Sequence, residues 1–369
     1  MKIAVVGAGP AGSFCAYRLA QAGAEVTQFD RYAEAWEKPC GGGVPPKVRE
    51  RFAEIAAYDG PRRVVNVGNF TSPKGVAVRL EGGRALWIVS RRDFDGYIRR
   101  LARDAGARFA NERIRRVERD GNGFILHGEG EHRFDFVVGA DGVLSVVRRD
   151  LLAPMDKRLV CMTVGYFLEA DLAEAATWFL PKPGYVWSFP RTDHTCLGGG
   201  TSDPDLDMWP LIEEIRRNHY PTNKILKKWA APIPAISVPA YFDQPISGDG
   251  FALVGDAAGH VDALSGEGIF YAIWGGHLLA RALIEGKPTQ YEDAWRGEYG
   301  RELQKTSDMA GAFYKPKMIE RFLWVASRSE AMREFFGTIM TDEPSYLTLR
   351  KMFVRRLPRI AFQLLRSLW

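Results

Sequence analysis

Residues 2–13 read KIAVVGAGPAGS, and their pattern indicates the fold class. The apolar run Lys2–Val6 stops at a glycine, as a buried parallel strand does, so we interpret it as a strand rather than a signal peptide. Good helix formers then run from Pro10 to Ala22 and stop at Gly23. The opening residues therefore predict a strand, a glycine turn and a helix, which is how a βαβ unit begins.

Three glycines in that turn, Gly7, Gly9 and Gly12, form a GxGxxG pattern. The first permits the tight turn, the second lets a pyrophosphate approach the backbone, and the third lets the helix pack on the strand. The helix N-terminus then offers free N–H groups to the phosphates. Asp30 follows the next expected strand, 18 residues after Gly12, where a carboxylate accepts hydrogen bonds from an adenosine ribose. This arrangement predicts a dinucleotide site, without separating FAD from NAD.

Later motifs separate the two cofactors. FALVGDAAG (residues 251–259) is a second strand–glycine–acid unit, SGEGI follows at residues 265–269, and VVGADGVLSVVRR and SRRDFD occupy residues 137–149 and 90–95. These motifs, and the order in which they follow one another along the chain, resemble those of the para-hydroxybenzoate hydroxylase-like flavoproteins. The resemblance implies that the cofactor is FAD. It also implies FAD contacts from Arg91, Ile114, Asp141, Asp256, Gly268 and Ile269.

Two further segments narrow the resemblance. KPCGGGVPPK (residues 38–47) and PGYVWSFPR (residues 183–191) are similar to segments of the geranylgeranyl reductases. This second resemblance implies that Cys40, Gly41 and Gly43 contact FAD. Independently of it, Tyr185, Trp187 and Phe189 alternate on an expected strand and should project from one face. Such a face would line a slot for an apolar substrate, cover the isoalloxazine ring, or simply pack in the core of a sheet. The loop before SGEGI departs from the family at His260, Asp262 and Ala263.

The favoured hypothesis is therefore an FAD-dependent reductase of carbon–carbon double bonds in a prenyl or other apolar substrate. Hydride would pass from N5 of the reduced flavin to a carbon held about 3–3.5 Å away, and NADPH, NADH or another donor would reduce the flavin. Cys40, Tyr185 and His194 are candidate proton donors, with no basis in the sequence for choosing among them. The alternatives are a flavin monooxygenase with the same fold and a non-catalytic flavin-binding interaction protein.

The pattern of elements predicts an α/β fold. We expect a Rossmann-like FAD-binding domain from residues 1–157 and 240–285, with an inserted antiparallel β-sheet substrate domain at residues 158–239. A helical C-terminal region should occupy residues 286–369. The β-like runs within residues 60–90 belong either to the first domain or to the sheet of the second.

Composition limits the remaining choices. The four cysteines lack metal-ligand or disulfide-framework spacing, so we expect no metal site and a cytoplasmic location. The net charge is +5, and residues 344–369 contain six basic and no acidic residues mixed with apolar ones. Such a basic amphipathic tail favours peripheral contact with an anionic membrane, although it also fits a terminal helix packed on its own protein. No motif for nucleic-acid binding accompanies the charge.

Overall fold

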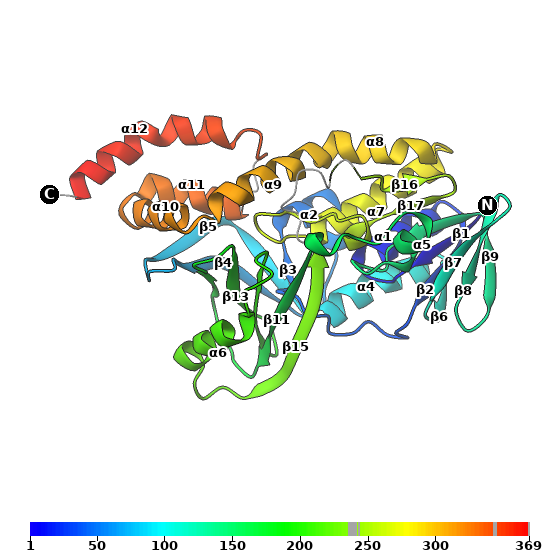
Figure 1. Ribbon diagram of the computed structural model, residues 1–369, viewed down its shortest axis with the longest axis horizontal. Helices are drawn as coiled ribbons and strands as arrows, with labels where there is room; N and C mark the ends of the chain where they lie inside the picture. Colours follow the sequence, from blue (N-terminus) through cyan, green and yellow to red (C-terminus); the bar gives the residue numbers. More distant parts are fainter. Residues whose placement is uncertain (235–241, 243, 342–344, 368–369) are drawn as a thin grey trace.

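The computed structural model describes residues 1–234, 242, 244–341 and 345–367. It contains two large β-sheets and a series of C-terminal helices that runs along one side of both (Figure 1). The predicted architecture is confirmed: an α/β unit with a mainly parallel sheet, a second and mainly antiparallel sheet, and a helical C-terminal region. Within the described residues, no helix has both the length and the apolar character that crossing a bilayer requires.

The first sheet has six strands in the order β16-β17-β10-β1-β2-β6. All neighbours pair in parallel except β16, which runs antiparallel to β17. The strands are β1 (Lys2–Val6), β2 (Glu25–Asp30), β6 (Arg108–Asn111), β10 (Phe136–Gly139), β16 (Ser247–Gly248) and β17 (Phe251–Leu253). Because β1, β10 and β17 are neighbours, three distant parts of the chain end at one edge of the sheet, which is where open α/β sheets bind ligands.

Helices α1 (Pro10–Gln21), α4 (Arg91–Asp104) and α7 (Ile269–Ile284) pack around this sheet. The approach of α7 to α1 is so close that a Cβ atom added to Gly276 would lie 2.5 Å from the carbonyl oxygen of Ala11. The first and last thirds of the chain therefore form one packed unit. The shorter helices α2 (Pro46–Arg51), α3 (Ala53–Ala56) and α5 (Val146–Leu151) complete it, with a small sheet of β7 (Arg116–Asp120), β8 (Gly123–His127) and β9 (Glu131–Phe134).

The second sheet has eight strands in the order β15-β11-β14-β13-β12-β4-β5-β3. Its pairings are antiparallel except for that between β12 and β4. The strands are β3 (Gly43–Val44), β4 (Arg62–Thr71), β5 (Ala77–Val89), β11 (Val160–Leu168), β12 (Ala175–Phe179), β13 (Gly184–Pro190), β14 (Thr195–Thr201) and β15 (Ile225–Pro234). The strands expected within residues 60–90 thus lie in this sheet, where α6 (Met208–His219) packs on β11 and β14. The predicted domain boundary at 239/240 lies outside the described residues.

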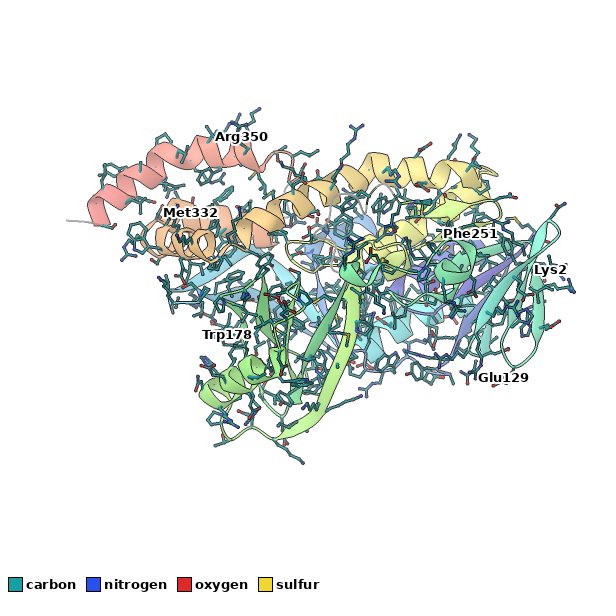
Figure 2. All side chains as sticks on the ribbon, in the orientation of Figure 1. Lys2, Glu129, Trp178, Phe251, Met332 and Arg350 are labelled. Atoms are coloured by element: carbon teal, nitrogen blue, oxygen red, sulfur yellow. The ribbon has the colours of Figure 1, made fainter. Side chains whose placement is uncertain are left out.

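Four C-terminal helices build a second apolar core at the far end of the molecule: α9 (Arg301–Phe313), α10 (Pro316–Arg328), α11 (Glu330–Thr341) and α12 (Leu349–Ser367). The short helix α8 (Tyr291–Trp295) packs in the first core instead. Ile319, Leu323 and Ala326 of α10 recur at helical spacing and pack in one cluster with Phe70 and Leu80 of the second sheet. Phe251 and Met332 mark the two cores at opposite ends of the structure (Figure 2).

Candidate functional site

The turn after β1 has the geometry that phosphate binding needs. Gly7 has a φ of +106°, and an added Cβ would lie 2.3 Å from the carbonyl oxygen of Ala140. An added Cβ at Gly12 would lie 2.1 Å from the carbonyl oxygen of Gly7, whereas the space beside Gly9 is open. Gly9 is the N-cap of α1, and no side chain caps this helix. Its first N–H groups are therefore directed at open space, as an anion site requires.

Asp30 ends β2 beside that turn. Its Oδ2 accepts the N–H of Ala8 at 2.8 Å, and its Oδ1 accepts the N–H of Tyr32 at 2.9 Å. The guanidinium of Arg99, on α4, lies 3.8 Å from Oδ2. The carboxylate is thus held in place next to the turn, where a ribose hydroxyl can reach it.

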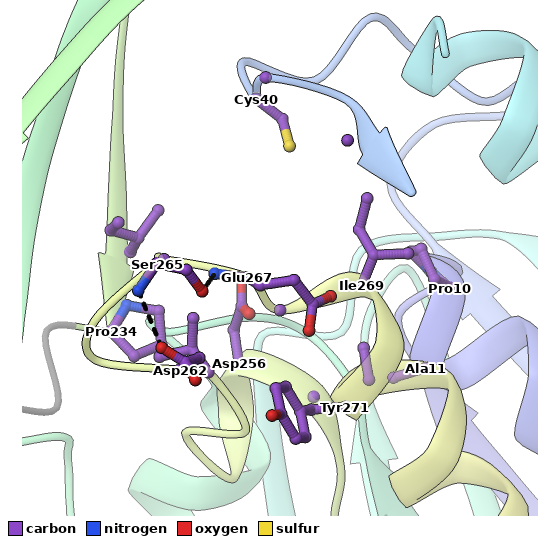
Figure 3. A pocket seen from close by; sticks show the side chains of 18 of the residues that line it. Pro10, Ala11, Cys40, Pro234, Asp256, Asp262, Ser265, Glu267, Ile269 and Tyr271 are labelled. Carbon is purple, nitrogen blue, oxygen red and sulfur yellow. Dashed lines mark hydrogen bonds between the residues drawn. The ribbon is translucent and has the colours of Figure 1, made fainter. Parts of the chain in front are cut away.

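The second glycine–acid stretch lies against the first. Asp256 follows β17, Gly268 is the N-cap of α7, and a Cβ added to Gly255 would lie 2.9 Å from the Cβ of Ala11. Asp256 forms an ion pair with Lys38 at 3.3 Å. In the close-up, Asp256, Ile269, Pro10 and Ala11 surround one space (Figure 3). Residues 7–12 and 255–269 therefore converge on one site, although more than 240 positions separate them.

Both stretches line a cavity of about 1650 Å³. Single-ligand sites usually occupy about 300–1,000 Å³, so this cavity has room for a dinucleotide and a second molecule. The predicted cofactor contacts that line it are Gly7, Gly9, Asp30, Cys40, Gly41, Gly43, Arg91, Ile114, Asp141, Asp256, Gly268 and Ile269. Gly12 instead supports the turn from behind, through its contact with Gly7. This arrangement fits an FAD. The N-terminus of α1 is uncapped, Asp30 and Asp256 lie beside the two glycine stretches, and the turn of Gly7 leaves no room for a side chain.

Two of these residues hold local structure as well. The guanidinium of Arg91, which is buried, makes two hydrogen bonds to Asp95 at 2.8 and 2.7 Å, so it fixes the start of α4 at the cavity wall. Asp141 accepts the hydroxyl hydrogen of Ser145 and the N–H of Val146 at 2.7 Å. Burial raises the pKa of the Asp141 carboxyl to about 6.

The loop that carries Cys40 is pressed against the second sheet. Gly42 has a φ of +78°, and an added Cβ would lie 2.2 Å from the carbonyl oxygen of Val89. A Cβ on Gly41 would lie 2.6 Å from the ring of Phe189. Only glycines allow this approach, which brings the thiol of Cys40 to the cavity between the two sheets.

A buried arginine, Arg191, fixes this loop, and no motif in the sequence predicts that role. The side chain of Arg191 is fully buried, and it donates to the carbonyl oxygen of Cys40 while pairing with Glu37. Glu37 in turn accepts the hydroxyl of Ser90 at 2.5 Å and the N–H of Arg91 at 3.0 Å. The network joins the Cys40 loop, β13 and α4. The only sequence signal for it was the position of Arg191 directly after YVWSFP.

Tyr185, Trp187 and Phe189, the predicted substrate residues, all line the cavity from β13. The hydroxyl of Tyr185 donates to the carbonyl oxygen of Ser265 at 2.5 Å, and burial raises the pKa of this phenol. Tyr185 therefore ties β13 to the loop that precedes α7. The structure brings Cys40 and Tyr185 to the same cavity as the cofactor stretches.

His194 is placed differently. It lies in the turn between β13 and β14, where its ring centroid is 4.7 Å from that of Phe167. Its Nδ1 forms a hydrogen bond with Oδ1 of Asp193 at 2.8 Å. Among the described residues it is not part of the cavity lining. The structure therefore does not bring this third predicted catalytic residue to the other two.

The far end of the cavity is an apolar arm that no sequence pattern predicts. Side chains of α9, α10, α11 and α12 close it, together with residues of β4 and β12. We define the apolar arm by the residues Phe70, Phe179, Met309, Phe313, Phe322, Phe335, Phe336, Ile339, Leu349 and Phe353. Ring contacts link its wall, for example Phe70 to Phe336 with ring centroids 4.7 Å apart. A cofactor cradle and an apolar arm thus share one cavity.

This fold and site define an FAD-dependent oxidoreductase, and residues 1–179 match the FAD binding domain family. The chain belongs to the geranylgeranyl reductase family. It is 30% identical to the chloroplastic geranylgeranyl diphosphate reductase of Oryza sativa subsp. japonica, over 93% of this chain and 79% of the relative. It is 29% identical to the geranylgeranyl diphosphate reductase of Rhodobacter capsulatus, over 92% of this chain and 91% of the relative.

Other similar proteins agree with this assignment. The digeranylgeranylglycerophospholipid reductase of Methanocaldococcus jannaschii is 28% identical, over 94% of this chain and 96% of the relative. Among solved structures, a geranylgeranyl bacteriochlorophyll reductase-like protein from Thermoplasma acidophilum has a TM-score of 0.79 at 18% identity, covering 95% of this chain and 98% of the other. A flavin-dependent brominase has a TM-score of 0.75 at 17% identity, covering 96% of this chain and 98% of the other. At these identities the two structures show the shared fold alone.

Proposed function

We propose that this FAD-dependent oxidoreductase reduces carbon–carbon double bonds of a prenyl-type chain that lies in the apolar arm. The observation that carries the proposal is the continuity of the cavity, which runs from the glycine turn of α1 past Cys40 and Tyr185 to the rings of the C-terminal helices. A chain of isoprene units is apolar along its length, and only an apolar channel of this kind lets it shed water. The curated relatives, named as reductases of geranylgeranyl compounds, support the same substrate class.

Bound FAD, once reduced by NADPH, NADH or another donor, supplies the hydride. The residues of the chain bind and orient. The turn of Gly7 and Gly9 holds the pyrophosphate, Asp30 the adenosine ribose and Asp256 the ribityl chain, while Gly268 and Ile269 lie at the flavin end.

Near the reacting bond, we propose that Cys40 contacts both the cofactor and the substrate, from a loop that Arg191 holds still. Trp187 and Phe189 form an apolar surface beside that loop, and Tyr185 fixes the loop opposite. Together they keep water from the bond that is to be reduced and hold it close to the cofactor, which is the protein's main contribution in such a reaction.

The proposal is tested by mixing anaerobically reduced holoenzyme with geranylgeranyl diphosphate or a glycerolipid that carries geranylgeranyl chains. We expect reoxidation of the flavin and a product two mass units heavier for each bond reduced. Consumption of oxygen together with hydroxylation of the substrate would instead establish the monooxygenase alternative, which shares this fold. Flavin that no donor and no substrate turns over would establish a binding protein.

We further propose that the outer face of α12 rests on an anionic membrane. Val354, Leu357, Phe362 and Leu365 are large apolar side chains exposed on this helix. The helix contains no acidic residue, and Arg355, like Lys351 and Arg366, forms no ion pair within the described residues. Apolar and cationic side chains on one surface suit an interface with anionic lipid.

The position of α12 also suits a lipid substrate, because its first residues Leu349, Arg350 and Phe353 line the cavity. A cytoplasmic protein that docks through α12 would present the cavity to the membrane. Co-sedimentation with anionic vesicles, before and after removal of residues 345–369, tests this contact. Equal binding of the two proteins would exclude it.

A further inference from the structure

Glu267, in the middle of SGEGI, has no part in the function described so far. Its side chain projects into the cavity from the loop before α7, in the same close-up as Cys40 and Asp256 (Figure 3). Oε1 accepts the N–H of Phe270 at 2.6 Å, which anchors the residue at the start of the helix. Oε2 forms an ion pair with Nζ of Lys47 at 3.5 Å. One oxygen therefore holds the fold, and the other faces a lysine, where it can release or take up a proton.

The surroundings of Glu267 favour its protonated form. Burial raises the pKa of the carboxyl group, and the negative charge of Asp262 in the same loop acts in the same direction. Lys47, from α2, and the N–H of Phe270 oppose this shift, but the net change in pKa is upward. Asp262 accepts the N–H groups of Leu264 and Ser265, each at 2.8 Å. Glu267 is thus a carboxyl group held toward its acid form in a cavity wall.

The other candidate donors are placed less favourably. The hydroxyl hydrogen of Tyr185 is engaged by the carbonyl oxygen of Ser265, and His194 lies outside the cavity lining. Cys40 does line the cavity, so the choice falls between its thiol and the carboxyl group of Glu267. An acid that saturates an alkene must be refilled with a proton after each turnover. A carboxyl group beside a lysine is suited to that cycle, because the lysine stabilises the anion that forms.

We propose that Glu267 donates the proton that completes reduction of the double bond, and that Lys47 stabilises the carboxylate left behind. This inference rests on the proposed function. The π bond of the alkene breaks, and one carbon receives hydride, with its electron pair, from reduced FAD. The other carbon uses the π electrons to form a C–H bond with the proton of the Glu267 carboxyl group. The carboxylate then takes a proton from water, so no further reactant is needed.

The first test is Glu267→Gln. The amide oxygen can still accept the N–H of Phe270, so the loop should stay in place while the acid is lost. We expect reoxidation of the reduced holoenzyme by geranylgeranyl diphosphate, without oxygen, to slow by about 100-fold or more, as loss of a general acid usually does. FAD content and reduction of the flavin by the donor should not change. The matched control is Glu285→Gln, an exposed acid at the other end of α7, which should react at the wild-type rate.

The second test does not depend on that variant. In Lys47→Met the carboxylate loses its cation, so the pKa of Glu267 should rise further. The alkaline limb of the pH profile for reoxidation should therefore move to higher pH. The infrared band of a protonated carboxyl group should persist to higher pH in the same variant and be missing in Glu267→Gln. A band that moves while the limb of the rate profile stays in place would overturn the proposal, because a purely structural Glu267 changes its pKa without changing the pH dependence of the reaction.

The outcomes separate the two proposals. If the wild-type protein is not reoxidised by any prenyl substrate, the proposed function fails and this inference fails with it. If the wild type is reoxidised and Glu267→Gln keeps within about threefold of its rate, only the proton donor is wrong. A severe loss in Cys40→Ala, with Glu267→Gln unaffected, would assign the proton to the thiol instead.

Discussion

The two ends of the cavity are built from different parts of the polypeptide. The cofactor end is built mainly from backbone, in two glycine turns and two helix N-termini, with two acids beside them: Asp30 at the end of β2 and Asp256 after β17. The apolar arm consists of side chains, contributed by β4, β12 and four helices. A backbone site requires particular residues at particular spacings, whereas an apolar wall accepts any side chains of suitable size. This difference predicts that changes at the two ends will affect different ligands.

The largest effect should come from Gly7→Ala at the cofactor end. A side chain there meets both a positive φ, which costs about 1–2 kcal/mol, and a carbonyl oxygen 2.3 Å away. We expect the purified protein to lack FAD, as judged by its absorbance spectrum. Gly23→Ala is the matched control, because Gly23 also has a positive φ, +82°, but nothing lies within 4 Å of its added Cβ. An alanine at position 7 that retains a full complement of FAD would contradict the account of this turn.

A charge in the apolar arm should have the converse effect. Phe313→Asp places a carboxylate among the rings of Phe179 and Phe322, where water is scarce. We expect the affinity for a prenyl substrate to fall by about 100-fold, because desolvating an unpaired charge costs several kcal/mol, while FAD binds as in the wild type. Phe313→Leu should change substrate affinity little. Parallel titrations with FAD and with geranylgeranyl diphosphate measure both effects. An equal loss of affinity for the two ligands would show that the two ends of the cavity do not bind them separately.

Acid should destabilise the folded protein through His260, in the loop between β17 and α7. The imidazole is fully buried and stacks on the ring of Trp295, with the ring centroids 4.2 Å apart. Burial lowers the pKa of this imidazole to about 3. Between pH 6.5 and 3 the unfolded chain therefore binds a proton that the folded chain does not, so stability is lost as the pH falls. From an unfolded pKa near 6.5, the loss at pH 5 is about 2 kcal/mol.

His260→Phe removes this titration while keeping a planar ring against Trp295. Denaturant melts at pH 8 and pH 5 should show a smaller loss of stability in the variant than in the wild type. Identical pH dependence in the two proteins would mean that His260 is not the acid-sensitive group.

The smallest effect concerns the outer face of α12. Leu365→Asp should weaken binding to anionic vesicles by about tenfold, since a partly buried leucine contributes about 1–2 kcal/mol. Leu226→Asp, an exposed leucine on β15, should bind like the wild type. If both variants bind equally well, α12 is not the docking surface.

The sequence predicts the cofactor end of the cavity better than the apolar arm, because the cofactor end depends on spacing along the chain. Gly7, Asp30 and Asp256 could be found because their roles impose spacing on neighbouring residues, and the structure brings all three to one cavity. The ion pair of Arg191 with Glu37 could not, since 154 positions separate two residues that no local pattern links.

The apolar arm was missed for a related reason. Phe313 and Phe336 belong to amphipathic helices, and their spacing does not distinguish a ring that packs in a core from one that lines a cavity. His194 was a candidate proton donor by its residue type, and residue type does not say which way a side chain points. The strand ends at Pro190, and the chain then turns away from the face that carries Tyr185.

We expect one cavity to hold the cofactor at its glycine end and the prenyl chain at its helical end. A crystal structure of the holoenzyme soaked with geranylgeranyl diphosphate would locate both ligands. We predict electron density for the isoalloxazine ring between the Cys40 loop and Ile269, and for the isoprenoid chain running from there along Phe313 and Phe336. Density for the chain outside this cavity, or flavin bound away from residues 7–12, would contradict the account.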